Sequence, residues 1–434
     1  MQPHRRKSER EPPKLADEAK WYSEHHALLI NTIKWALLGA MAGVCVGLGT
    51  RLFLWALDAG TAQAKRLEAI GVPYYYFLPL AMPLCVLLIR TFAPAAKGHG
   101  TEQVIAAVHQ TSGKVAWRVA PVKLIGTVLT LAFGGSVGKE GPCAQIGAAI
   151  TSGFADLMRL HNKDRRKLVI CGIGAGFSAV FGAPVAGAMF GIEVLYVGRI
   201  EYPVLFPCLV AGIVAHLVCG GHVPIPVLHE SFQQISQVSM VLWSVLFGGI
   251  FGLAAFILIE AMRAMEKALR KAARYPYLVA AAGGTALCIL YRIAGDSYAG
   301  LGTQTIEASL AGTANLMLGA FLIKIIATTI TLETGGSGGI ITPIFFIGAT
   351  TGAALAHVFH LPEGIFAAIG LVAVLAAAAN TPIAAAVMGM ELLPTTVGVY
   401  AALAGCTAFL IVGHRSVYAS QKLGFSKSSG WVET

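Results

Sequence analysis

Seven long apolar runs dominate this chain of 434 residues. Each run is long enough to cross a hydrocarbon core of about 30 Å as a helix. A soluble chain of this length would need a charged surface, but only 12% of the residues are charged and 56% are hydrophobic. The sequence therefore predicts an all-α polytopic membrane protein. The runs cover roughly residues 29–58, 73–93, 201–221, 237–262, 275–293, 313–332 and 397–413.

Shorter apolar stretches, interrupted by glycine and proline, lie between these runs. Several of them are too short to cross a bilayer, so we expect half-helices that end inside the membrane. Irregular backbone at that depth is tolerated only where protein buries it or where it lines an aqueous cavity. The stretches cover residues 98–112, 119–135, 141–158, 168–180, 183–197, 303–311, 343–358, 363–379 and 382–393.

Glycine, proline and charged residues of the first half recur in the second half in the same order. The offset stays between 198 and 202 residues, which predicts two homologous repeats with a transport site at their interface. The matched residues are Gly98, Gly100 and Thr101 with Gly300, Gly302 and Thr303; Lys123 with Lys324; Gly134, Gly135 and Ser136 with Gly335, Gly336 and Ser337; Pro142 with Pro343; and Pro184 and Glu193 with Pro382 and Glu391. The expected organisation is a tail over 1–26, a first repeat over 27–200, a connecting span and polar loop over 201–236, a second repeat over 237–425 and a tail over 426–434.

Positive charge gathers in three tracts, at about residues 5–20, 159–167 and 263–274. Because these tracts lie beside apolar spans, the positive-inside rule places them, and the N-terminus, in the cytoplasm. The net charge of +10 therefore does not indicate a nucleic-acid partner. The first tract contains acids and prolines and resembles a tail more than a signal peptide. The eight cysteines lie in or beside apolar stretches without a C-x-x-C pair, so we expect no metal site, disulfide or cofactor.

The two most glycine-rich breaks each end at a proline, Pro142 in the first repeat and Pro343 in the second. Proline suits the first turn of a helix, so we expect helices from about 141 to 158 and from 343 to about 358. The first N–H groups of a helix have no intrahelical partner, and together with the helix dipole they attract anions. Two helix N-termini directed at one point near the membrane midplane would form an anion site.

Other interpretations of the glycine motifs are weaker. Gly138 and Lys139 suggest a phosphate-binding P-loop, but the spacing to Gly134 is one residue too short and Glu140 replaces the required Ser or Thr. The glycines between 172 and 176 lie in an apolar helix, which favours close helix packing over a dinucleotide loop. A membrane-embedded enzyme would need a nucleophile–base pair or metal ligands in the breaks, and a carrier of organic solutes would show regular spans. We therefore expect a protein that is not an enzyme.

Ionisable residues inside membranes are costly and usually functional. Glu140 lies in the first break, where its carboxylate competes with an anion for the same N–H donors and leaves when protonated. It is therefore the predicted gate and a candidate proton carrier. His99 lies between two glycines in an earlier break and either donates a hydrogen bond to an anion or has a structural role.

Two pairs of charged residues occupy equivalent positions in the repeats. Lys123 and Lys324 either raise the positive potential at the site or extend their ammonium groups to the membrane surface, and both roles stay open. Glu193 and Glu391 follow their prolines at equal spacing, which favours a structural role as caps on the N–H groups of a neighbouring break.

Together these residues resemble the CLC family of chloride channels and chloride/proton exchangers, over about residues 30–425. Gly138–Pro142 resembles the G-[KR]-E-G-P motif of the family and Gly339–Pro343 its G-x-F-x-P motif. Gly98–Glu102 stands where the family has G-S-G-I-P, and Phe181–Glu193 resembles its F-N-A-P…E stretch. The resemblance implies a homodimer with one pore per subunit, two repeats of inverted topology and the short prokaryotic form, in a prokaryotic inner membrane.

The resemblance also implies roles for single residues. Glu140 corresponds to the gating glutamate, the N–H groups of Ile340 and Ile341 to the donors of the central site, and Tyr418 to the pore tyrosine. Lys123 is expected to give electrostatic support. The expected anion-binding set is His99, Gly138, Lys139, Gly141, Gly339, Ile340, Ile341 and Tyr418.

Four positions depart from the family pattern. His99 replaces the pore serine that the family links to chloride preference, Glu102 replaces a proline, and Ile341 replaces a phenylalanine. Val194 stands where exchangers carry an inner proton-transfer glutamate, although Glu193 or His99 could substitute for it. We therefore expect transport of an inorganic anion, chloride first, by passive conduction more than by proton exchange. A fluoride/proton antiporter of the same fold is the alternative.

Overall fold

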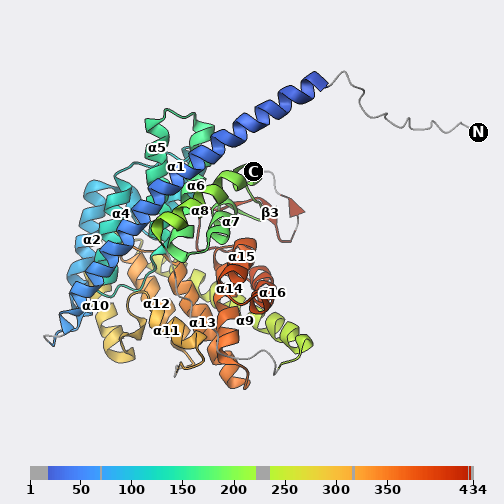
Figure 1. Cartoon of the computed structure of the whole chain (residues 1–434). Helices are drawn as coiled ribbons and strands as arrows, with labels where there is room; N and C mark the ends of the chain where they lie inside the picture. Colours follow the sequence, from blue (N-terminus) through green and yellow to red (C-terminus); the bar gives the residue numbers. More distant parts are fainter. Residues whose placement is uncertain (1–17, 69–70, 221–234, 315–317, 429, 432–434) are drawn as a thin grey trace, which may run out of the picture.

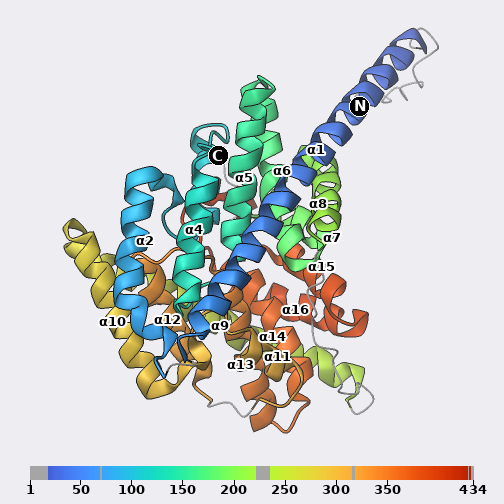
Figure 2. The same cartoon turned by 60° about the vertical axis from the view of Figure 1, so that its left-hand side comes forward.

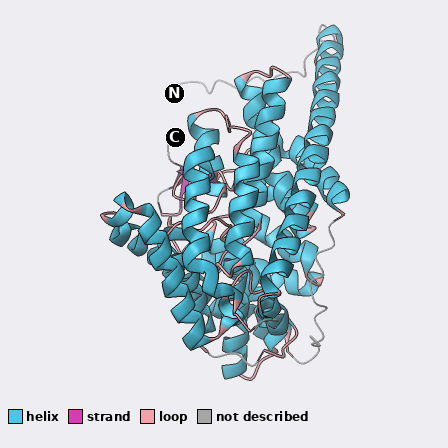
Figure 3. Ribbon diagram, turned by 90° about the vertical axis from the view of Figure 1, so that its left-hand side faces the viewer, coloured by secondary structure: helices cyan, strands magenta, loops and turns pink. Residues whose placement is uncertain are grey.

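The computed structural model describes residues 18–68, 71–220, 235–314, 318–428 and 430–431, and these residues form a mainly helical body (Figures 1 and 3). The helices are α1 (Glu18–Lys65), α2 (Leu78–Phe92), α3 (Thr101–Gln110), α4 (Val119–Ala132), α5 (Glu140–Leu157), α6 (Asn162–Phe181), α7 (Pro184–Glu193), α8 (Leu205–Cys219), α9 (Gln237–Leu269), α10 (Pro276–Ala294), α11 (Thr303–Leu310), α12 (Ala320–Glu333), α13 (Ile341–Val358), α14 (Glu363–Ala378), α15 (Pro382–Leu392) and α16 (Thr395–Ile411). Short strands form two small sheets, in which β1 (Tyr196–Val197) pairs with β2 (Lys422–Leu423) and β3 (Phe425–Ser426) with β4 (Gly430–Trp431).

Six helices of the described chain are long and apolar enough to cross a membrane, which supports the predicted polytopic architecture. Two predicted spans are shorter than expected: the run at 313–332 gives α12, which has 14 residues and starts after Gly319, and the run at 397–413 gives α16, which has 17. In contrast, α13 was expected as a half-helix, yet its 18 residues place it among the six. The two predicted helices after the glycine-rich breaks are confirmed as α5 and α13.

Helix α1 is longer than the sequence indicated. It begins at Glu18, so the last residues of the tail predicted over 1–26 are helical, and its first turns extend beyond the rest of the body (Figures 1 and 2). Near this end Lys34 forms an ion pair of 2.6 Å with Asp164 at the start of α6. This ion pair places the N-terminal half of α1 beside the start of α6, which carries much of the second positive tract. Most of the predicted polar loop over 222–236 falls outside the described residues.

Glycines let helix backbones touch in both repeats. A Cβ on Gly147 of α5 would collide with the carbonyl of Gly172 of α6. In the second repeat, a Cβ on Gly348 of α13 would collide with the carbonyl of Gly370 of α14. The interpretation of the 172–176 glycines as packing residues is confirmed, because this close approach requires the absence of a side chain.

Glu193 and Glu391 cap each other's helices. Glu193, at the end of α7, accepts hydrogen bonds from the N–H groups of Ile383 (3.1 Å) and Ala384 (2.6 Å) in the first turn of α15. Glu391, near the end of α15, accepts bonds from Val185 (3.2 Å) and Ala186 (2.8 Å) in the first turn of α7. The predicted capping role is confirmed. Each carboxylate satisfies N–H groups that have no partner inside their own helix.

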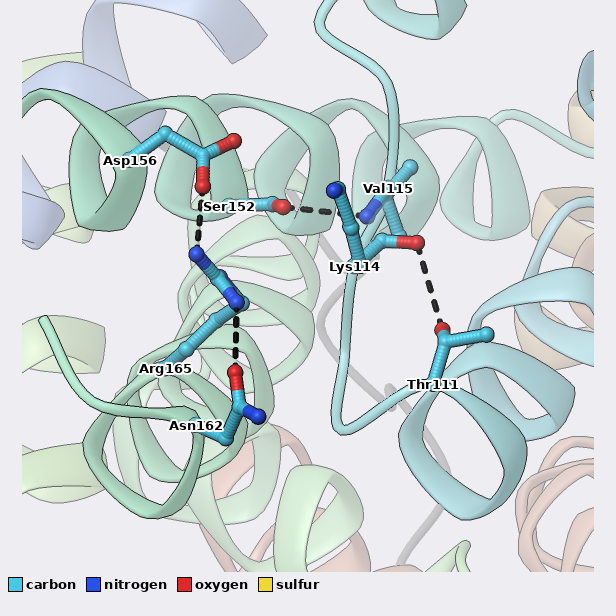
Figure 4. A network of polar contacts seen from close by, with 7 residues as sticks. All are labelled: Thr111, Lys114, Val115, Ser152, Asp156, Asn162 and Arg165. Atoms are coloured by element: carbon cyan, nitrogen blue, oxygen red, sulfur yellow. Dashed lines mark hydrogen bonds and ion pairs between the residues drawn. The ribbon is translucent and has the colours of Figure 1, made fainter. Parts of the chain in front are cut away.

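A polar network fixes the ends of α5 and α6 that lie far from the breaks (Figure 4). Arg165 donates to Asp156 (2.5 Å) and to Asn162 (2.9 Å), which joins the two helices across their turn. The N–H group of Val115, in the connection that follows α3, donates to the hydroxyl of Ser152 (3.0 Å). The bond to Ser152 ties the connection after α3 to α5. Both helices begin at a glycine-containing break that the sequence predicts to form part of the site.

The reciprocal caps predict a measurable loss of stability. Glu391→Ala leaves two N–H groups of α7 without their acceptor, and we expect the free energy of unfolding to fall by about 1–3 kcal/mol. Denaturant unfolding of the purified protein in detergent measures this change. Glu266→Ala, at an exposed position of α9, is the matched control and should leave stability unchanged. Equal stability of Glu391→Ala and the control would contradict the capping role.

Candidate functional site

The two glycine-rich breaks meet and pair with each other. The N–H group of Gly138 donates to the carbonyl of Gly339 (2.7 Å), and the N–H group of Gly339 donates back to Gly138 (2.6 Å). These two amides were expected to face an anion, but in this conformation each is used by the other break. Their pairing places the start of α5 beside the start of α13.

Glu140 reaches from the start of α5 to the start of α13. Its Oε1 accepts a hydrogen bond from the hydroxyl of Thr342 (2.6 Å), and its Oε2 accepts one from the N–H group of Thr342 (3.2 Å). The side chain is 1% exposed. The carboxylate therefore occupies the N-terminus of α13, where a helix binds an anion best. Ile340 and Ile341, the predicted donor residues, immediately precede Thr342 and are buried.

His99 and Tyr418 lie together on the other side of the start of α5. Their ring centroids are 5.4 Å apart. His99 Nδ1 is buried and has no hydrogen-bond partner among the described residues, and the buried Tyr418 hydroxyl lies near the Thr101 hydroxyl. The carbonyl of His99 lies so close to Gly141 that a Cβ there would collide with it. Gly141 thus lets the break that contains His99 pack directly against the residue that follows Glu140.

Two buried lysines hold the backbone of equivalent breaks. Lys123 donates to the carbonyls of Ala96 (3.2 Å) and Gly98 (2.5 Å), next to His99. Lys324 donates in the same way to Tyr298 (3.0 Å) and Gly300 (2.9 Å). Both side chains are fully buried, so the proposed extension of these lysines to the membrane surface is wrong. Their ammonium groups instead satisfy backbone carbonyls where the helices are interrupted.

Lys139 and Glu140 line a cavity of about 110 Å³. Thr303 and Glu307, in α11, form part of the opposite wall, together with apolar residues of α13, α14 and α15. The cavity therefore reaches Glu140, the predicted gate. Lys139 is the one residue of the expected anion-binding set that lines it beside Glu140.

The segment after α16 is fixed where it passes the site. Val417 donates its N–H group to the carbonyl of Ala378 (3.0 Å), and the N–H group of Tyr418 donates to Ser416 Oγ (3.0 Å). Gln421 donates to the carbonyls of Val194 (2.8 Å) and Ala379 (2.9 Å). Tyr418 is therefore held from both sides, and Val194 is buried beneath this segment.

Two contacts at the site were not expected from the sequence. Thr342 was named only as part of a motif, although a hydroxyl residue just before Pro343 at the start of a helix is well placed to bind a carboxylate or an anion. Glu102 was noted as a departure from the family motif without a role, and the structure shows it bonded to Ser420. Within the described residues, no group of three His, Cys, Asp or Glu side chains could hold a metal ion.

Known proteins with this organisation are anion channels and exchangers. A chloride/fluoride channel protein of Pseudomonas syringae pv. tomato is 36% identical over 411 residues, which are 92% of this chain and 89% of the relative. The H(+)/Cl(−) exchange transporter ClcA of Cronobacter sakazakii is 28% identical over 390 residues, covering 82% and 81%.

Solved structures similar to this chain are also anion transport proteins. The crystal structure of a CLC-type fluoride/proton antiporter superposes with a TM-score of 0.82 at 27% identity, over 90% of this chain and 98% of that one. A slow cyanobacterial Cl−/H+ antiporter, at 21% identity and a TM-score of 0.75, shares the fold over 87% and 94% of the two chains. The family model described as voltage gated chloride channel matches residues 80–413. The chain therefore belongs to the voltage-gated chloride channel family, the CLC family of membrane anion transport proteins.

Proposed function

We propose that this protein moves a small inorganic anion between the cavity at Lys139 and the buried polar groups of His99 and Tyr418, and that Glu140 is the gate. The observation that supports this most strongly is the position of the Glu140 carboxylate, which accepts both donor groups of Thr342 at the N-terminus of α13. A carboxylate is itself an anion, so a group that binds it there also binds a transported anion.

The gate follows from competition for the same donors. While Glu140 is ionised, its two oxygens use the N–H and O–H groups of Thr342, and an anion cannot bind there. Protonation removes the charge that the helix N-terminus attracts, the side chain leaves, and an anion takes its place. Lys139 beside the gate makes the approach favourable for anions. The ion leaves again because no full counter-charge lies in contact with it.

Fluoride is the proposed principal ion, and its transport is proposed to be coupled to protons. Fluoride holds its water tightly and gives it up only to strong hydrogen-bond donors. Thr342 and Tyr418 offer hydroxyl groups, and the Nδ1 tautomer of His99 would offer an N–H group. The 36% identical relative is named a chloride/fluoride channel protein, which supports fluoride as an ion, and the fluoride/proton antiporter structure described above supports proton coupling.

Passive chloride conduction is the second candidate. It is favoured by Val194, whose buried side chain cannot transfer a proton at the end of α7. In this case Glu140 would gate the pathway without returning its proton to the other side of the membrane. The names of the relatives include chloride as well as fluoride, so the two ions need to be compared in one experiment.

Four further features of the protein are proposals. We infer a homodimer, a prokaryotic inner membrane location and a cytoplasmic N-terminus from the family resemblance and the positive tracts. Cross-linking in membranes tests the dimer, and protease accessibility of the N-terminus tests its side. The two repeats with boundaries near residues 27–200 and 237–425 are likewise proposed as the units of inverted topology.

Liposomes that contain the purified protein test the proposed function. Fluoride or chloride efflux and external pH are recorded together, with and without a potassium ionophore. Fluoride efflux that drives proton uptake against a gradient supports antiport. Chloride efflux that needs only the ionophore supports the second candidate, and absence of flux for both ions contradicts both.

The proposed gating role of Glu140 predicts how Glu140→Gln changes proton movement and anion flux. Glutamine keeps the size of the side chain but cannot bind or release a proton, so proton movement should stop while anion flux persists. The same liposome recording measures both quantities. Glu266→Gln, which changes an exposed carboxylate of α9 outside the site, is the control and should leave both unchanged. Proton movement that survives Glu140→Gln would contradict the proposed gate.

A second prediction concerns the choice of ion. His99→Ser replaces the imidazole with a smaller hydroxyl group and leaves room for a larger anion. We expect the ratio of fluoride flux to chloride flux to fall at least about threefold, because selectivity is the difference between two binding free energies. Parallel efflux measurements with each ion give the ratio. An unchanged ratio would show that His99 does not help to select the ion.

The equivalent lysines provide a matched pair of variants. Lys123→Met and Lys324→Met each remove two hydrogen bonds to a break, so both should lower stability. Only Lys123 holds the break that contains His99, and we therefore expect flux per folded protein to fall severalfold for Lys123→Met alone. Flux is normalised to the folded fraction from size-exclusion chromatography. Equal loss of flux in both variants would assign Lys123 a general structural role.

A further inference from the structure

Glu102 links the first turn of α3 to the segment that contains Tyr418. Its Oε1 accepts hydrogen bonds from the N–H group of Ser420 (2.9 Å) and from the Ser420 hydroxyl. The two residues are 318 positions apart in the chain, so the link joins the first repeat to the end of the second. It holds the chain two residues after Tyr418.

The second carboxylate oxygen of Glu102 has no such partner. Oε2 is buried and has no hydrogen-bond partner among the described residues, as is true of His99 Nδ1. His99 and Glu102 are three positions apart in the chain. The ring centroids of His99 and Tyr418 lie 5.4 Å apart. The carboxylates of Glu102 and Glu140 are both close enough to Tyr418 to act on its hydroxyl electrostatically. Buried polar atoms without protein partners usually contact water or an ion.

The charge of Glu102 matters for an anion beside these groups. His99 and Tyr418 can each offer a neutral donor, whereas an ionised Glu102 repels an anion, with little screening inside the protein. Weak binding at this point is useful for transport, because an ion that is held too tightly does not leave. A neutral side chain at position 102 would keep the link to Ser420 and remove the repulsion.

We propose that Glu102 sets the anion affinity of the site between His99 and Tyr418: its bonds to Ser420 position Tyr418, and its negative charge weakens anion binding there. The ligand is a small inorganic anion, so this inference rests on the proposed function. Glu102 is a positioning and affinity-setting residue, and it does not need to touch the anion.

Calorimetric titration of the full-length protein with sodium fluoride and sodium chloride tests this inference. All variants carry Glu140→Ala, which removes the competing gate carboxylate. Adding Glu102→Gln keeps an oxygen acceptor for Ser420 but removes the charge, and the Kd for the anion should fall at least about fivefold. Adding Glu102→Asp keeps the charge, and adding Ser420→Ala keeps the charge but removes one donor; neither should lower the Kd.

The other outcomes contradict the inference in distinguishable ways. An unchanged or higher Kd in Glu102→Gln overturns the role of the charge and leaves anion transport untouched. An equal fall in Kd for Glu102→Gln and Ser420→Ala assigns the effect to loosening of the Tyr418 segment and also overturns it. Absence of anion binding in the Glu140→Ala protein itself contradicts the proposed function as well. Size-exclusion chromatography of each variant confirms that the titrated protein is folded.

Discussion

The rest of the site depends on the interaction between the N-terminus of α13 and the acidic group that it binds. The N–H groups of this N-terminus have no partner inside the helix, they are buried in an apolar body, and they must bind a negatively polarised group. In this structure that group is the Glu140 carboxylate. The pairing of Gly138 with Gly339 brings carboxylate and helix together, because it joins the two breaks directly in front of their helices. One buried requirement for an acceptor thus underlies both the proposed gate and the proposed anion site.

The two repeats solve the same backbone problem in the same way. Every interrupted helix leaves carbonyl and N–H groups that lipid cannot satisfy. Lys123 and Lys324 satisfy the carbonyls of equivalent breaks. Glu193 at the end of α7 satisfies N–H groups of α15, and Glu391 in α15 satisfies N–H groups of α7. The asymmetry between the repeats lies where function is proposed: His99 occupies one break, while Leu301 occupies the equivalent position in the other.

Local sequence features predicted the helices after the breaks, the capping glutamates and the position of Glu140 at the first break. They could do so because proline, glycine and charge act within a few residues of their own position. The contacts that assemble the site could not be predicted in this way, because they join residues that are far apart in the chain. The bond from Thr342 to Glu140 spans 202 positions and the bond from Ser420 to Glu102 spans 318, and neither pairing leaves a periodic signal. The length of α1 was underestimated because its polar first turns do not resemble a membrane span.

We propose that an anion and the ionised carboxylate of Glu140 exclude each other at the N-terminus of α13. Calorimetric titration of the unmodified protein with fluoride, in two buffers of different ionisation enthalpy at one pH, gives the number of protons taken up for each anion bound. Glu140 must be protonated to leave, so the account predicts that proton uptake accompanies anion binding. Saturable anion binding without any proton uptake would contradict it.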